Sequence, residues 1–418
     1  MTISNRSRFL GALCTVAALC TALSACEEAT GPSAGGKKAT AAQVGGTDRQ
    51  GEVVESEPLV SMDSVHLKDY LKQQGFDPGG VRYGVDAYRV LYRTTSVAGT
   101  PTVGSAVVAY PQTEDDAELP VTTYLHGTNP VRAMAASVAD GPDRAGTLLF
   151  AGTGQATSAP DYPGLGLALG IPAYMQADPT VHAALDGVRA TRALAGKAHH
   201  RLRKEVNVAG FSQGAQAAMA VGRTLQNNAD PDSALGAIAA VSGPHDIVGT
   251  ELPAAFDGRV DPHEAVVYLG YFVTAWNHSF HLYDSPSEAF QAPYDQTVES
   301  LFDGSHPFPE IIQGLPESPD RLLRPEFLEK LSHPSGKLAE AVEANDRLCA
   351  GWAPRGPVRL YHGTADKDVP YANSEQCRRM LAESGTKAEL INAGPLDHNS
   401  TAIASFPKIA DWFASLKG

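Results

Sequence analysis

Basic residues are scarce in this chain of 418 residues, which has 33 Lys and Arg against 47 Asp and Glu and a net charge of −14. No basic run follows the N-terminus, so the composition argues against nucleic-acid binding. The acidic balance also gives no electrostatic help in docking on anionic lipids. Repeats of solenoid length are absent as well. The remaining composition, 43% hydrophobic and 19% charged, is typical of a globular protein with a large core.

Long apolar runs are also few, and the run at the N-terminus is too short for a lasting transmembrane helix. Arg6 and Arg8 precede the apolar stretch 9–22, and the sequence Leu-Ser-Ala-Cys26 follows it. This arrangement resembles a bacterial lipoprotein signal peptide. The resemblance implies that residues 1–25 are removed, that Cys26 is lipidated, and that the protein is exported and held on a membrane of the bacterial cell envelope, at its periplasmic face or at the cell surface. A plain signal peptide or a short membrane anchor are the alternatives.

Apolar periodicity is missing from residues 26–57, which are rich in Gly, Ala, Ser, Thr and Lys mixed with acids. That composition predicts a flexible tether. About 30 such residues would span roughly 30 Å as a random coil. The globular part, expected over 58–418, would therefore stand off the membrane.

Cysteine is rare, with five residues in the chain. Cys14 and Cys20 belong to the signal segment and Cys26 is assigned to lipidation, which leaves Cys349 and Cys377. Disulfides are permitted in an exported protein. Cys349 precedes a predicted strand and Cys377 lies on the helix after it, so either a disulfide or two separate buried thiols fits. Neither cysteine has metal-ligand spacing, so no metal site is predicted.

Strands and helices alternate along most of the chain after residue 58. The β-rich runs 88–93 and 103–110 predict an antiparallel hairpin. Apolar strands and helices then follow one another, which predicts a mainly parallel sheet with helices on both faces. The predicted strands are 121–125, 153–159, 206–209, 235–241, 358–361 and 388–392, with helices at 178–194 and 215–225 and at the C-terminus.

The alternation stops between about residues 247 and 352, where the chain is rich in Pro, Phe and Tyr and has only helical patches. Because this stretch lies between two sheet strands, it predicts an inserted, mostly helical cap over the strand ends. A separate small domain is the alternative, whereas the aromatic content argues against disorder. The aromatic run at 268, 271, 272, 276 and 280 is interpreted as cap core, with pocket lining as the other interpretation.

One short motif indicates chemistry: Gly210-Phe211-Ser212-Gln213-Gly214 lies between a predicted strand and a predicted helix. A G-x-S-x-G in that context is typical of the nucleophile elbow of α/β-hydrolases. The glycines permit a sharp turn that exposes the serine hydroxyl. An ordinary Gly-rich turn is the alternative, because composition alone can produce so short a pattern.

An activated serine needs a base and a carboxylate that orients the base. Downstream of Ser212, Asp366 follows the strand 358–361 and His398 follows the next strand, in the order expected for α/β-hydrolases. We therefore predict Ser212 as nucleophile, His398 as base and Asp366 as acid, with Asp368 as the rival acid. His362 and His126 are interpreted as structural histidines, and Asp397 as a local backbone acceptor or an aid to His398.

The tetrahedral intermediate also needs oxyanion donors. The backbone N–H of Gln213, next to the nucleophile, is one predicted donor. The second should come from the loop after an earlier strand, where the chain reads His126-Gly127-Thr128. We assign it to the N–H of Thr128, with Gly127 as the rival.

Together these motifs resemble the α/β-hydrolase superfamily from about residue 58 onward. The loop HGTADKDVP at 362–370 is similar to the acid loop of the prolyl oligopeptidase family and of many bacterial esterases. GFSQG resembles the elbow of acyl-protein thioesterases and carboxylesterases. The segments DYPGLG at 161–166 and LDGVRA at 185–190 resemble the secretory lipases, the group that includes fungal lipase A; Asp161, Asp186 and Arg189 in them are interpreted as scaffold. Two departures are Ala215, where relatives often have glycine, and the weakly apolar 151–158.

The resemblance implies a serine hydrolase of carboxylic or lipid esters that needs no cofactor and no metal. A peptidase of prolyl oligopeptidase type and a non-catalytic surface binding protein on a hydrolase scaffold are the alternatives. The sequence does not indicate the oligomeric state.

Overall fold

A computed structural model describes residues 49–113, 117–227 and 230–416. The predicted signal peptide, the lipidation site Cys26 and most of the predicted tether lie outside the described residues. Order begins earlier than expected, because strand β1 (Val53–Met62) includes residues 53–57, which were assigned to the tether. This strand is mostly exposed and pairs antiparallel with β2 (Val85–Thr95). Backbone pairing at a sheet edge, with little apolar burial, explains why its sequence gives no strong strand signal.

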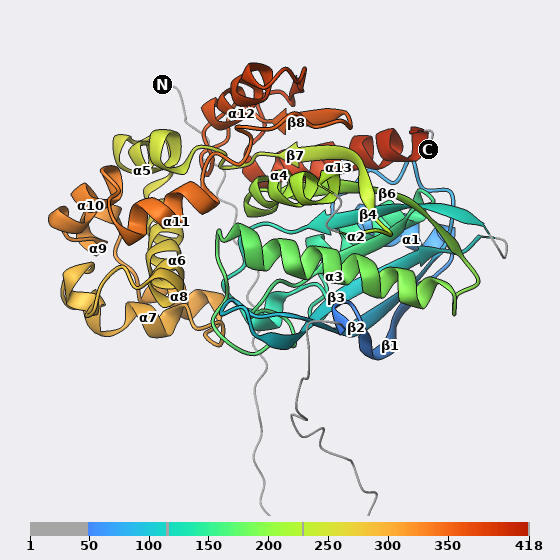
Figure 1. Cartoon of the computed structure of the whole chain (residues 1–418), viewed down its shortest axis with the longest axis horizontal. Helices are drawn as coiled ribbons and strands as arrows, with labels where there is room; N and C mark the ends of the chain where they lie inside the picture. Colours follow the sequence, from blue (N-terminus) through green and yellow to red (C-terminus); the bar gives the residue numbers. More distant parts are fainter. Residues whose placement is uncertain (1–48, 114–116, 228–229, 417–418) are drawn as a thin grey trace, which may run out of the picture. The chain divides into compact units, whose positions relative to one another are not determined.

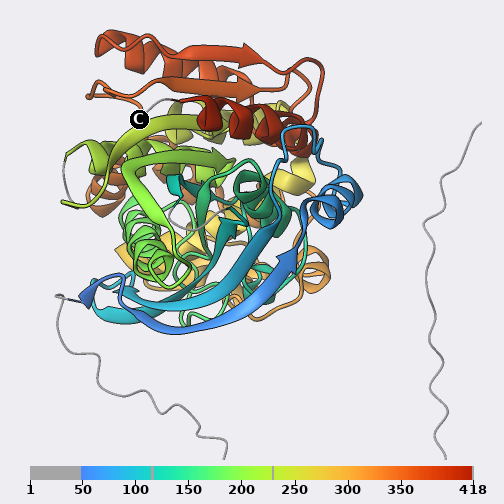
Figure 2. The same ribbon diagram turned by 90° about the vertical axis from the view of Figure 1, so that its right-hand side faces the viewer.

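A nine-stranded sheet forms the frame of the fold, in the order β1-β2-β3-β5-β4-β6-β7-β8-β9. In Figure 2 the sheet runs from strand β1, drawn in blue, at one edge to strand β9, drawn in red-orange, at the other edge. The first three strands and β5 pair antiparallel, and all pairs from β5 to β9 are parallel. The remaining strands are β3 (Pro101–Pro111), β4 (Glu118–Leu125), β5 (Ala156–Pro160), β6 (Arg201–Phe211), β7 (Ala234–Val241), β8 (Val358–His362) and β9 (Glu389–Asn392).

Helices cover both faces of the sheet (Figure 1). One face packs against α3 (Ala177–Ala195), α4 (Gln213–Gln226) and α12 (Ala372–Glu383). The other packs against α1 (Ser64–Gln73), α2 (Pro142–Gly152) and α13 (His398–Ser415). The predicted fold class, an α/β-hydrolase fold with a mainly parallel sheet between helices, is confirmed.

Between β7 and β8 the described chain forms only helices and loops, apart from an isolated bridge between Phe290 and Leu323. These helices lie together in yellow and orange in Figure 1 and share an apolar core that includes Tyr271 and Trp276. We refer to them as the cap. Its elements are the π-helix Ile247–Glu251, α5 (Leu252–Asp257), α6 (Pro262–Phe280), the short 3₁₀ turns Pro286–Glu288 and Tyr294–Gln296, α7 (Val298–Leu301), α8 (Phe308–Gln313), α9 (Pro319–Leu322), α10 (Pro325–Ser332) and α11 (Lys337–Asn345).

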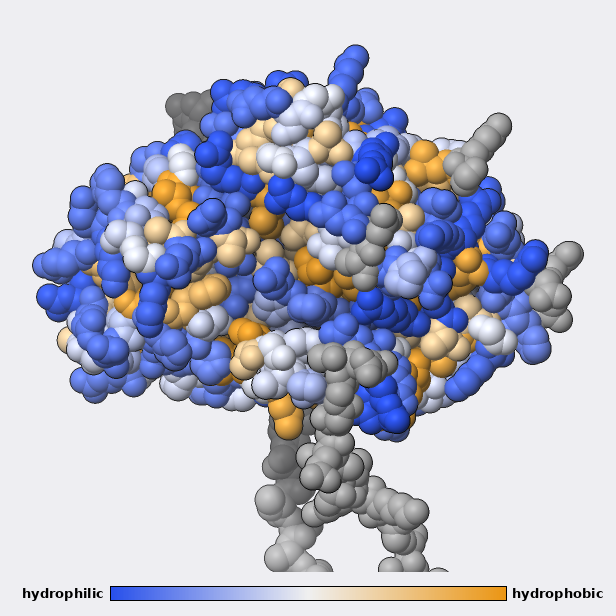
Figure 3. All heavy atoms as spheres, viewed as in Figure 1, coloured by the Kyte–Doolittle hydropathy of each residue, from blue (hydrophilic) through white to orange (hydrophobic). Residues whose placement is uncertain are grey.

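The face drawn in Figure 3 is largely hydrophilic, with apolar residues in small separate areas. Among the described residues, no helix combines the length and the apolar character that crossing a membrane requires.

Candidate active site

Ser212 lies in a sharp turn between β6 and α4 with φ 54° and ψ −120°. A positive φ is uncommon for a residue with a side chain. The turn is tight on both sides, since a Cβ added to Gly210 would lie 2.0 Å from the carbonyl oxygen of Gly214, and one added to Gly214 would lie 2.1 Å from that of Leu125. Only glycine fits at either position. The geometry is therefore that of a nucleophile elbow.

The hydroxyl of Ser212 points into open space although the residue is only 5% exposed. Within the described part of the chain, its Oγ has no hydrogen-bond partner, and the backbone N–H of Ser212 donates to Val241 O at 2.9 Å. Ser212 is thus free to contact a bound molecule.

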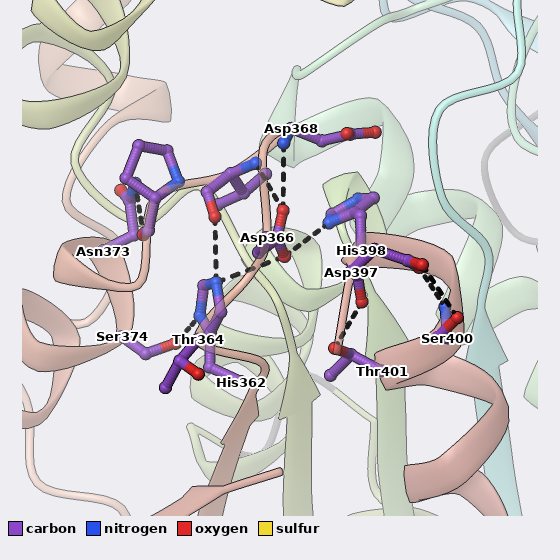
Figure 4. A network of polar contacts seen from close by, with 12 residues as sticks. His362, Thr364, Asp366, Asp368, Asn373, Ser374, Asp397, His398, Ser400 and Thr401 are labelled. Carbon is purple, nitrogen blue, oxygen red and sulfur yellow. Dashed lines mark hydrogen bonds and ion pairs between the residues drawn. The ribbon is translucent and has the colours of Figure 1, made fainter. Parts of the chain in front are cut away.

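His398 and Asp366 form a direct pair (Figure 4). Asp366 lies in the loop after β8, and His398 is the first residue of α13, which follows β9. The Nδ1 of His398 is 2.8 Å from Oδ2 of Asp366, and both side chains are buried. An imidazole held at Nδ1 by a carboxylate presents Nε2 as the free base.

The loop around Asp366 keeps this carboxylate ionised. Its Oδ1 accepts hydrogen bonds from the backbone N–H groups of Asp368 and Val369 at 3.0 and 2.9 Å. Nε2 of His362 also lies 3.3 Å from Oδ2. Burial raises the pKa of Asp366, but hydrogen bonds from His362 and His398 outweigh it and hold this pKa below its usual range.

The rival residues have other partners. Oδ2 of Asp368 accepts a hydrogen bond from Tyr268 Oη at 2.9 Å, so of the two aspartates it is Asp366 that contacts His398. Asp397 caps α13 by accepting from the backbone N–H of Ser400 at 2.8 Å. His362 ties its loop together through Ser374 Oγ at 2.7 Å.

The loop after β4 lies beside the elbow. A Cβ added to Gly127 would lie 3.5 Å from Cβ of Ser212. Thr128 and Gln213 both line the cavity that contains Ser212. Within the described part of the chain, no hydrogen bond engages the backbone N–H of either residue. Both predicted oxyanion donors are therefore available on the nucleophile's side of the site.

Two cavities meet at Ser212. The first, which we call the cap cavity, encloses about 820 Å³ between the elbow and the cap. Its walls are mostly apolar, and Tyr268 and Phe272 line it whereas Tyr271 and Trp276 are buried in the cap core. The aromatic run thus contributes both to the core and to the pocket. The cap cavity is lined by Thr128, Tyr174, Met175, Ser212, Gln213, Pro244, Ile247, Val248, Glu251, Leu252, Ala255, Val260, Ala265, Tyr268, Leu269, Phe272, Leu331, Leu338, Val342, Asp368 and Val369.

The second cavity, which we call the His398 cavity, encloses about 1180 Å³. It shares Thr128, Ser212, Tyr268 and Asp368 with the cap cavity. Its further lining residues are Phe76, Tyr124, Gly127, Pro130, Pro142, Asp143, Phe211, Glu264, Val267, Phe308, His398, Asn399, Ala402, Ile403 and Phe406. His398 lines this second cavity and not the cap cavity.

Sequence reasoning named Asp368 as a possible acid but missed the other carboxyl groups that line these cavities. Glu251 lies in the cap cavity, where Asn373 Nδ2 donates to it. Burial raises the pKa of Glu251 well above its usual range, and the negative charge of Asp366 raises it further. No local sequence motif identifies Glu251 as a cavity residue. The available signal is its position at the start of the insertion, shortly after the predicted strand 235–241.

The segments that resemble secretory lipases have structural partners. Asp161 is buried and accepts from Ser105 Oγ at 2.5 Å. Gly166 has φ +59°, and a Cβ there would lie 2.2 Å from Oδ2 of Asp161. Asp186 accepts from Thr94 Oγ1 at 2.7 Å and from Arg189 Nη1 at 2.6 Å. These residues hold loops and helices together, away from Ser212.

Cys349 and Cys377 form a disulfide, with Cα atoms 5.3 Å apart. The bond joins the chain just after the cap to α12. His245 is buried, and its ring lies within 4.8 Å of both sulfur atoms. Because both sulfurs are engaged in the disulfide, this group of residues is not a metal site.

Comparison with known proteins gives structural likeness alone. No protein-family model matches the chain, and no curated protein matches it either. A Legionella pneumophila protein, provisionally assigned as a hydrolase, superposes with a TM-score of 0.78 at 24% identity, covering 88% of this chain and 99% of that one. The rice cell wall degrading esterase LipA from Xanthomonas oryzae gives 0.75 at 22% identity over 87% and 96% of the two chains. Candida antarctica lipase A in its closed state gives 0.58 at 16% identity over 88% and 84%.

The fold and the site together define an α/β-hydrolase architecture with an elbow serine, an Asp–His pair and a helical insertion. At these levels of identity, the likeness to the solved structures establishes the fold.

Proposed function

We propose that this protein is an exported, lipid-anchored serine hydrolase that cleaves carboxylic esters, including lipid esters. The observation that carries the proposal is that His398, held by Asp366, lines one cavity with Ser212, whose hydroxyl has no hydrogen-bond partner among the described residues. A serine or histidine that only stabilises the fold does not need to lie at a cavity next to a buried carboxylate. The esterase and lipase titles of two structural neighbours point to the same chemistry.

The proposed mechanism uses residues of this chain alone. His398 accepts the Ser212 proton as Oγ attacks the ester carbonyl, and Asp366 stabilises the imidazolium. The N–H groups of Gln213 and Thr128 bind the oxyanion of the tetrahedral intermediate. His398 then protonates the leaving alcohol. Water, activated by the same histidine, releases the acid from the acyl-enzyme and restores Ser212.

The two cavities suggest how an ester is placed. The apolar cap cavity suits the acyl chain, because burying methylene groups is favourable. The alcohol is then directed to the His398 cavity, since the group that protonates its oxygen lies there. In this proposal the catalytic domain begins with β1, and the helices between β7 and β8 serve as its cap.

The test combines labelling and turnover. Ser212 should react with a fluorophosphonate probe in the folded protein, and Ser212→Ala should lose both labelling and at least about 10⁴-fold in p-nitrophenyl ester hydrolysis. Ser287→Ala, at an exposed cap position, is the matched control. Faster turnover of aminoacyl or prolyl amides than of esters would favour a peptidase. Absence of labelling would favour a binding protein.

Export and anchoring are proposed from the N-terminal sequence. Arg6 and Arg8, the apolar stretch 9–22 and Cys26 support a lipoprotein signal, and residues after Cys26 would serve as the tether. In a bacterial host, the full chain should incorporate labelled fatty acid and sediment with membranes. Cys26→Ser should do neither, and Cys20→Ser is the control. Fatty-acid incorporation that persists in Cys26→Ser would refute the assignment.

A further inference from the structure

The two cavities at Ser212 differ in the chemistry of their walls. The cap cavity is mainly aliphatic, with the carboxyl groups of Glu251 and Asp368 in its wall, whereas the His398 cavity combines aromatic rings with Asp143, Glu264 and the shared Asp368. Among residues 49–113, 117–227 and 230–416, no Lys or Arg lines either cavity, and His398 is the one potential cation in the lining.

These carboxylates lack counter-ions. Within the described part of the chain, no Lys or Arg lies within 4.0 Å of Asp143, Glu264 or Asp368. Asp143 and Asp368 accept hydrogen bonds from Tyr124 Oη and Tyr268 Oη, both at 2.9 Å, which are neutral donors. Burial raises the pKa of Glu264, and the charge of Asp368 raises it further. Among the described residues, no Lys or Arg therefore balances negative charge in this cavity, and a bound cation would do so.

The charge lies where the leaving alcohol must bind. Glu264 and Asp368 both interact electrostatically with His398, the group that protonates the alcohol in the proposed function. Ser212, nine-tenths buried and without a hydroxyl partner among the described residues, opens into the same space. The carboxylates therefore face the alcohol half of a bound ester.

We propose that the His398 cavity selects esters whose alcohol carries a positive charge, such as amino or quaternary ammonium alcohols. This inference rests on the proposed ester hydrolysis. A cation there is attracted by Glu264 and Asp368 and can lie against an aromatic face such as that of Phe308 or Tyr124. An anionic alcohol, such as a phosphorylated one, meets repulsion and no basic side chain.

The experiment compares two esters of one shape: butyrylcholine and 3,3-dimethylbutyl butyrate, in which carbon replaces the cationic nitrogen. At low ionic strength kcat/KM should favour the choline ester about tenfold. Glu264→Gln and Asp368→Asn should each lower this ratio several-fold. Glu343→Gln, an exposed carboxylate of α11 that lines neither cavity, should leave it unchanged.

The outcomes are distinct. A ratio of one or below, with the neutral ester cleaved through Ser212, would overturn the inference and leave the proposed function standing. Faster cleavage of monobutyrylglycerol than of butyrylcholine would overturn it in favour of neutral polyols. Failure of Ser212 to label, with no ester cleaved, would overturn both. As a second readout, tetramethylammonium should inhibit cleavage of the neutral ester competitively, and more weakly in Glu264→Gln.

Discussion

At the scale of single residues, the bond between Asp366 and His398 fixes which imidazole nitrogen is free. In Asp366→Asn the carboxylate is lost and an amide faces Nδ1, so the ring no longer presents Nε2 as a base. We expect kcat for p-nitrophenyl esters to fall by about 10⁴-fold at neutral pH with the fold retained. Asp368→Asn, whose partner is Tyr268, is the control and should fall less than tenfold with this substrate. Equal losses in the two variants would contradict the assignment of the acid.

His245 should make folding stability sensitive to acid. Neither ring nitrogen of this buried residue has a partner among the described residues, and burial, aided by His362, lowers its pKa to about 3. The unfolded chain therefore binds more protons at this site between about pH 3 and 6.5. Above that window His245 is neutral in both the folded and the unfolded chain, so it causes no pH dependence. As pH falls through the window, the unfolded chain takes up the proton, and the free energy of unfolding decreases by at most about 1.4 kcal/mol per pH unit.

His245→Leu should flatten this dependence. Urea unfolding at pH 7 and pH 5 would measure it, with the exposed His333→Gln as control. Equal acid sensitivity in His245→Leu and in the unaltered protein would show that other groups cause it.

At the same scale, sequence gives the strongest basis for a prediction where chemistry and local context coincide. Ser212, Asp366 and His398 each follow a recognisable strand, so their positions could be predicted before the structure. Glu251 and Glu264 could not be predicted as cavity residues, because their approach to Ser212 depends on how the cap folds back on the strand ends.

At the scale of elements, the disulfide between Cys349 and Cys377 holds the end of the cap to α12. The cysteines are 28 residues apart, and a loop of that size corresponds to a stabilisation of about 3.5 kcal/mol. Replacing both cysteines by Ala should lower the free energy of unfolding by about that amount while ester hydrolysis at 25 °C persists. Urea unfolding with and without reductant measures this change. Unaltered unfolding in the double variant would show that the bond adds no stability.

Strands that are buried in the core could be predicted from the sequence more readily than exposed ones. The buried parts of β6 and β7 were predicted as strands, whereas the exposed first half of β6 was not. Residues 53–57 of the exposed edge strand β1 were assigned to the tether, and α1 and α2 were not predicted. The start of α3 also differed by one residue from the predicted range 178–194, since the helix begins at Ala177 with Gln176 as its N-cap. Helix ends depend on backbone partners that the apolar pattern does not encode.

At the scale of the whole molecule, the cap is joined to the core by hydrogen bonds between distant segments. Asn345 Oδ1 accepts from the backbone N–H of Ala177 at 2.7 Å, and its carbonyl oxygen accepts from Gln216 Nε2. Tyr271 Oη donates to the carbonyl oxygen of Asn129 at 3.1 Å. Such pairings have no local signature, which explains why the sequence predicted that a cap exists but not the shape of the cavity beneath it.

That cavity leads to a prediction about acyl-chain length. If the cap cavity holds the acyl chain, each added methylene should raise kcat/KM about fourfold, from about 0.8 kcal/mol per buried methylene, until the cavity is full. Rates on p-nitrophenyl esters of rising chain length, kept below substrate solubility, would measure this. Ala255→Phe, which narrows the cavity, should move the plateau to shorter chains and leave acetate hydrolysis unchanged, whereas Ala382→Phe, at an exposed position on α12, should change neither. A rate that is independent of chain length, or an equal loss on acetate in Ala255→Phe, would place the acyl chain elsewhere.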